Sequence, residues 1–245
     1  MCDHLVNNCY KSVKMSYPKI QIFIFGIFVF FLSCLFSCNT VKQDDIPLKT
    51  YYFPLEDLVN GKNYIYQCDS RDSIEDQRFQ FRSEKVGDKW YLNGKIYRSD
   101  GVLTHSWREE VTRSGVVMDQ YSMYLDHSNP TTCTIKYDDI YPFKADSGGV
   151  FLYSISWMDA ANPDTKYELI RNRIYKGHLN LTIMAQQVDC IHFGVKEKLE
   201  VNQEGILGLD MTGDEFYGKG IGLVRFVRQM GNEHLIYTLV SIKDL

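Results

Sequence analysis

Most of the chain after residue 60 consists of short segments in which apolar and polar residues alternate, separated by turn dipeptides. The clearest pair, 75–86 and 89–98, flanks the hairpin turn candidate Gly87-Asp88. Similar segments follow at 102–112, 116–125, 132–140, 150–158, 167–175, 178–185, 188–201, 220–228 and 233–242. Successive side chains of a strand point to opposite faces, so this pattern predicts consecutive antiparallel strands. Roughly ten short strands at this spacing indicate a meander, a sandwich or a barrel.

One helix is expected, at the start of this region. Pro54 opens the segment 54–61 and Gly61 closes it, which is the usual asymmetry of helix ends. We therefore predict an all-β domain over residues 51–245. Its core would be a single antiparallel, strongly curved sheet, either a half-barrel or a barrel-like meander, with one short N-terminal helix.

The residues before this domain have the layout of an export signal. Three lysines precede the uncharged run 22–32, as the charged and apolar regions of such signals require. Residues 1–14 fit no targeting pattern, so Met15 is an alternative start of translation. We predict that residues 1–37 are removed during export.

The end of the apolar run, Leu35-Phe36-Ser37-Cys38, resembles the cleavage box of bacterial lipoproteins. The small Ser37 would fit the peptidase, and the thiol of Cys38 would carry the lipid. This resemblance implies lipidation at Cys38, followed by a lipidated tether over residues 38–50. Cys34 ends a competing box.

A lipid anchor would place the domain at a membrane. Asn39, which follows the cysteine, resembles the signal for outer-membrane sorting, so the expected location is the outer membrane, facing the periplasm or the cell surface. An uncleaved transmembrane helix is the alternative, because the run 20–38 approaches the ~20 residues that span a bilayer.

Composition argues against a nucleic-acid partner. The chain has 31 acidic and 27 basic side chains and no basic block, whereas nucleic-acid binding relies on clustered positive charge. Three cysteines follow the anchor: Cys68, Cys133 and Cys190. Their odd number allows at most one intramolecular disulfide, and their strand-like surroundings favour buried free thiols.

The segment EFYGKGIGLV (215–224) carries the most specific resemblance in the chain. Its pattern of aromatic, small, any, Gly, aliphatic, Gly, aliphatic and Val resembles the C-terminal strand of uncharacterised Gram-negative envelope lipoproteins with a β-rich domain. DCIHF (189–193) and FPL (53–55) add to this resemblance, which implies a fold and no activity. In a strand, the three glycines would bare one face, so that the sheet could coil or another segment could lie close.

Arg171 and Arg173 are the candidate ligand-binding residues. They share one face of the strand predicted over 167–175, and together they form the only cationic pair placed to clamp an anion. The alternative is that each pairs with a Glu or Asp on a neighbouring strand.

No catalytic residue, metal site or cofactor is predicted. His105 and Glu109 share one strand face, but no partner motif accompanies them. Cys190 and His192 also share a face, yet zinc requires three or four converging ligands. The pair Asp138-Asp139 lacks the spacing of a calcium loop.

The concave face of a curved sheet favours a non-catalytic binding module, whose ligand would be a lipid or another apolar molecule, or an envelope partner protein. A structural component of an envelope complex is the first alternative, and it would have a filled interior and an exposed apolar patch. A periplasmic hydrolase is the second. It would need several of five side chains to converge in one pocket: His105, Glu109, Arg171, Arg173 and His192.

Overall fold

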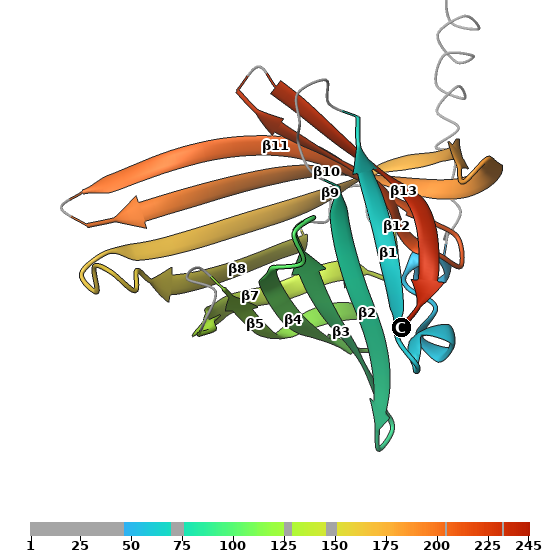
Figure 1. Cartoon of the computed structure of the whole chain (residues 1–245), viewed down its shortest axis with the longest axis horizontal. Coiled ribbons are helices and arrows are strands. Elements are labelled where there is room, and N and C mark those ends of the chain that lie inside the picture. Colours follow the sequence, from blue (N-terminus) through green and yellow to red (C-terminus); the bar gives the residue numbers. More distant parts are fainter. Residues whose placement is uncertain (1–46, 70–75, 125–128, 146–150, 204, 232) are drawn as a thin grey trace, which may run out of the picture. The chain divides into compact units, whose positions relative to one another are not determined.

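The computed structural model (Figure 1) describes residues 47–245, except 70–75, 125–128, 146–150, 204 and 232. The described residues belong to one compact unit, Asp45–Leu245. The predicted export signal, Cys38 and most of the predicted tether lie outside them. Within the described part of the chain, no helix combines the length and the apolar character needed to cross a membrane.

Nearly all of this unit is β-structure. The strands are β1 (Lys62–Cys68), β2 (Gln77–Val86), β3 (Lys89–Tyr97), β4 (Leu103–Val111), β5 (Gly115–Met123), β6 (Thr131–Thr132), β7 (Thr134–Pro142), β8 (Phe151–Met158), β9 (Lys166–Ile183), β10 (Gln186–Asn202), β11 (Ile206–Gly218), β12 (Gly222–Met230) and β13 (Glu233–Asp244). Two 3₁₀ turns, η1 (Leu48–Tyr51) and η2 (Leu55–Leu58), precede them.

The strands form one closed antiparallel sheet. Neighbours in sequence pair in space, with the two-residue β6 attached to β5 and bypassed by the β5–β7 pairing. The first strand, β1, pairs with the last, β13, so the meander closes into a barrel. The predicted all-β class, the single sheet and its curvature are therefore confirmed, and the barrel alternative is the one observed. Gly87 adopts φ 63° in the β2–β3 turn, where the sequence predicts a hairpin.

The predicted N-terminal helix is present as the two 3₁₀ turns. Leu48 and Leu58 are fully buried, and Gly61 ends the segment at φ 81°. The Tyr141 hydroxyl donates to the Leu48 carbonyl at 2.8 Å, and the Phe53 ring lies 4.3 Å from the ring of Phe81. This segment thus packs into one end of the barrel, and residues 48–50 of the predicted tether are part of the folded unit.

The glycine segment 215–224 is not one strand. Residues 219–221 form the turn between β11 and β12, so the prediction of a continuous strand is wrong. The close approach predicted there does occur, because a Cβ on Gly222 would lie 2.3 Å from Cδ1 of Phe53. Gly222 also adopts φ 97°, which an L side chain rarely takes.

The strands β9, β10 and β11 are the longest neighbouring strands, and they extend beyond the others in Figure 1. At the start of β11, Ile206 and Leu207 are 70% and 73% exposed. The barrel therefore carries an apolar projection at the β10–β11 hairpin.

The three cysteines of the domain are free thiols. Cys133 and Cys190 are buried, and Cys68 is half-buried. The preferred state in the sequence analysis, free thiols in strands, holds for Cys190 in β10 and Cys68 in β1. Cys133 lies between β6 and β7 instead of within a strand.

Candidate functional site

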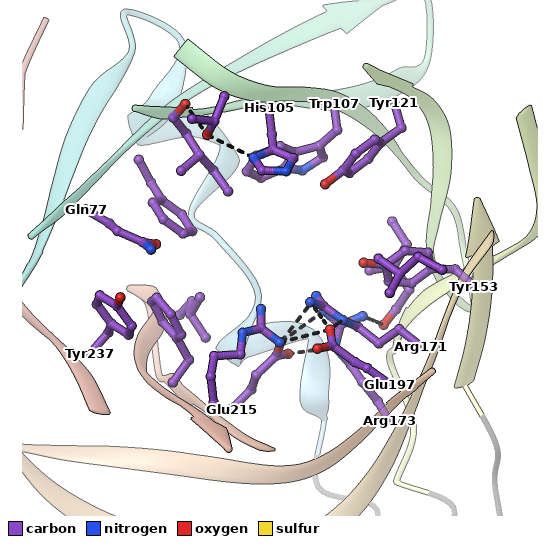
Figure 2. A pocket seen from close by; sticks show the side chains of 18 of the residues that line it. Gln77, His105, Trp107, Tyr121, Tyr153, Arg171, Arg173, Glu197, Glu215 and Tyr237 are labelled. Atoms are coloured by element: carbon purple, nitrogen blue, oxygen red, sulfur yellow. Dashed lines mark hydrogen bonds and ion pairs between the residues drawn. The ribbon is translucent and has the colours of Figure 1, made fainter. Parts of the chain in front are cut away.

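The barrel encloses a cavity of about 590 Å³, a size typical of pockets for small-molecule ligands. Aromatic side chains make up much of its wall. They include Phe79, Phe81, Trp107, Tyr121, Phe226 and Tyr237. Figure 2 shows Trp107 and Tyr121 on the side opposite a cluster of charged residues.

Strand alternation and register place these side chains in the cavity. On β4, His105, Trp107 and Glu109 all point inward, as every second residue must. Gly94 lies directly opposite Trp107 on β3, and a Cβ there would come within 2.2 Å of the indole ring. The glycine therefore leaves the space into which Trp107 lies.

The deepest ion pair of the cluster joins Arg173 of β9 to Glu215 of β11. The Arg173 Nε atom lies 2.7 Å from Glu215 Oε2, and its Nη1 donates to the Ile140 carbonyl at 3.0 Å. The Tyr217 hydroxyl also donates to Glu215, at 3.2 Å. The side chains of Arg173 and Glu215 are 6% and 4% exposed, so this pair is withdrawn from solvent and fully hydrogen-bonded.

A second group of charges lies next to this pair. Arg171 donates to Glu197 through Nε and also lies 3.6 Å from Glu215. Arg228 of β12 reaches the same Glu197 oxygen with its Nη1 at 2.9 Å. Two guanidinium groups thus share the single carboxylate of Glu197.

These contacts keep both carboxylates of the cluster ionised. Burial alone would raise the pKa of Glu215, but Arg173 and Arg171 outweigh it and lower that pKa to about 2. For Glu197 the same opposition, with Arg171 and Arg228 as the cations, also gives a lowered pKa.

Glu109 lies toward the end of the barrel that the N-terminal segment covers. The Tyr52 hydroxyl and the Trp107 indole N–H both donate to its carboxylate, the latter at 2.8 Å. Burial nevertheless raises the pKa of Glu109, against the effect of these donors and of the charge on Arg173.

His105 is neutral at physiological pH. Its pKa falls to about 4 because burial disfavours the imidazolium and because Arg171 and Arg228 repel it. Its Nδ1 lies 2.9 Å from the Thr104 hydroxyl. The wall that carries His105 therefore lies in the positive field of the arginines opposite.

Both predicted binding residues, Arg171 and Arg173, line the cavity. Each is also paired with a glutamate on another strand, so the structure combines the two interpretations that the sequence left open. Of the five side chains that a hydrolase would need to bring together, four line the cavity, whereas His192 lies outside it, 2.6 Å from Asp214. The four do not form a nucleophile–base pair, because His105 contacts only a threonine beside it among the described residues.

Sequence analysis missed three members of the cluster: Glu197, Glu215 and Arg228. Each alternates in register with apolar neighbours on its strand, which is the available signal for an inward position. Within the described residues, no three His, Cys, Asp or Glu side chains are grouped closely enough to hold a metal ion.

Comparison with solved structures supports the fold. One crystal structure, described as "a putative lipoprotein from Parabacteroides distasonis", has a TM-score of 0.51 and 15% identity, covering 79% of this chain and 98% of its own. A second, described as "a putative exported protein with YmcC-like fold" from Bacteroides fragilis, has a TM-score of 0.45 and 14% identity, covering 75% of this chain and 95% of its own. No protein-family model and no curated protein matches the chain.

Proposed function

We propose that this chain is a non-catalytic envelope lipoprotein whose barrel binds an apolar ligand. The cavity is the observation that carries this proposal. A structural component would fill its interior with packed side chains, whereas this barrel leaves about 590 Å³ open behind an aromatic wall.

The lipoprotein part of the proposal comes from the sequence. Cys38 would bear the lipid and residues 39–46 would connect it to the barrel, with the outer membrane as the location and palmitate among its acyl chains. The fold shared with a structure that is itself described as a lipoprotein agrees with this assignment. Intact-mass analysis of the membrane-extracted chain tests it, because Cys38→Ser should abolish the acyl adduct and Cys34→Ser should retain it.

An envelope partner protein is the second candidate, and one observation favours it. Leu207 is 73% exposed and Leu209 is 52% exposed, both on the projecting β11 strand. Exposed apolar side chains grouped in this way are typical of contact surfaces. Ligand binding in the cavity and partner contact at the hairpin are compatible, since the two use different residues.

Native mass spectrometry tests the binding function. The unit 45–245, exported to the periplasm of a Gram-negative host, should carry a co-purifying lipid that organic extraction releases. Met211→Trp places a larger side chain into the cavity from its wall and should reduce the bound lipid severalfold. Met158→Trp is the matched control, because Met158 is 46% exposed and lies outside the cavity.

The outcome separates the two candidates. A bare protein mass, together with no uptake of added lipid, would rule out the cavity as a binding site and leave the partner-binding candidate. Equal lipid content in Met211→Trp and Met158→Trp would show that the lipid binds elsewhere on the domain.

A further inference from the structure

We propose that the ligand of the cavity is an amphiphile with one acidic head group, which Arg171 and Arg228 hold while the apolar tail lies along the aromatic wall. The acidic group is a carboxylate or a phosphate, since a guanidinium group binds either with paired hydrogen bonds. This inference rests on the proposed function and adds the chemical class of the ligand.

The first argument is the number of uncommitted donors. All three nitrogen atoms of Arg173 are engaged, two with Glu215 and one with a backbone carbonyl. Arg228, in contrast, uses only Nη1 in a hydrogen bond within the described part of the chain, and its side chain is 30% exposed. Arg228 therefore presents further N–H donors where a ligand could accept them.

The second argument is the sign of the charge at this level of the barrel. Arg171 and Arg228 share the one carboxylate of Glu197, which leaves an excess positive charge. The effect reaches the opposite wall, where both arginines contribute to the lowered pKa of His105. An anion bound between these groups would balance the excess in surroundings where an unbalanced charge is unfavourable.

The third argument is the apolar surface that continues from this cluster. Leu169 lies two residues before Arg171 on the same face of β9 and lines the cavity. On β11, Met211 lines the cavity, and Leu209 and Leu207 continue the same face into solvent. A ligand with its head at the arginines would thus find an apolar path for its tail toward the projecting hairpin.

Three ligands with the same tail test the head group: laurate, dodecyl phosphate and dodecanol. Their binding to the unit 45–245 is measured by calorimetry below their micellar concentrations. We expect an acidic ligand to bind at least about tenfold more tightly than dodecanol, as a hydrogen bond to a charged group allows. The tighter of laurate and dodecyl phosphate identifies which acidic group the site prefers.

Arg228→Gln supplies the matched mutational test. It should weaken binding of the preferred acidic ligand about tenfold and leave dodecanol binding unchanged. Arg225→Gln, on the same strand but outside the cavity, should change neither. A urea unfolding curve for each variant shows that the domain remains folded, and the His105 pKa, followed by NMR, should rise when the acidic ligand binds.

The outcomes distinguish this inference from the proposed function. If none of the three ligands binds, the cavity is not a lipid site and both proposals fail. If dodecanol binds as tightly as the acidic ligands, or if Arg228→Gln leaves all affinities unchanged, the acidic head group is refuted while the cavity remains a binding site.

Discussion

Replacing Glu215 with glutamine should destabilise the barrel by about 3–5 kcal/mol at neutral pH, because it leaves the buried charge of Arg173 without its anion. The pKa of Glu215 leads to a similar magnitude. A carboxyl group whose pKa falls from 4.5 to about 2 on folding contributes about 3 kcal/mol when ionised. The two estimates use different reasoning, so their agreement makes the expected loss specific.

The pH dependence follows from the direction of that change. A lowered pKa in the folded state means that the stabilisation is complete above about pH 4.5 and declines as the pH falls toward about 2. The stabilities of wild type and Glu215→Gln should therefore converge on acidification. Urea unfolding, followed by fluorescence at pH 7 and pH 3, measures both values.

Two further variants complete this experiment. Glu168→Gln breaks the more exposed pair with Lys136 and should lose no more than about 1 kcal/mol. The double change Arg173→Met and Glu215→Leu removes both buried charges and should be less destabilising than Glu215→Gln alone. The reasoning is refuted if Glu215→Gln loses less than about 1 kcal/mol, or if its loss at pH 3 equals that at pH 7.

Two other predictions concern the ends of the barrel and its thiols. Gly222→Ala should destabilise the domain by at least about 1 kcal/mol, because the added Cβ would collide with Phe53 at a positive φ; Gly205→Ala, in open space, should be nearly neutral, and equal unfolding midpoints would contradict this. Cys133 and Cys190, whose pKa values burial raises to about 11, should resist maleimide labelling at neutral pH until urea unfolds the domain; rapid labelling of both in the native protein would show that the thiols are accessible.

The local pattern of the chain is sufficient to predict most strands, because each one has its own alternation and its own turn residues. The strand β11 escaped prediction although its sequence does alternate: Leu207, Leu209 and Met211 are separated by Gly208 and Asp210. Glycine and aspartate are unfavourable in strands, and their presence disguised the pattern. Pairing with β10 along thirteen register positions compensates for this weak propensity.

The break expected between 175 and 178 also reflects a local signal that tertiary structure overrides. Lys176-Gly177 resembles a turn, but Gly177, at φ 135°, lies at an irregularity in the pairing between β9 and β10. The irregularity lets one strand continue through a change of register. A glycine in such a position indicates a bulge as readily as a turn, and the pairing of the neighbouring strand decides between them.

The candidate site shows the same limit at the level of side chains. Alternation places Arg171 and Arg173 on one face of β9, and this could be predicted from 167–175 alone. Their partners Glu197, Glu215 and Arg228 lie 26 or more residues away, on strands whose register the local sequence does not determine. Closure of the sheet through β1 and β13 then turns that face into an enclosed wall. In an open sheet, solvent would screen the same arginines and they would form ordinary surface ion pairs. In the barrel they face a cavity that excludes most of the solvent, so the charge they leave unbalanced acts on whatever enters.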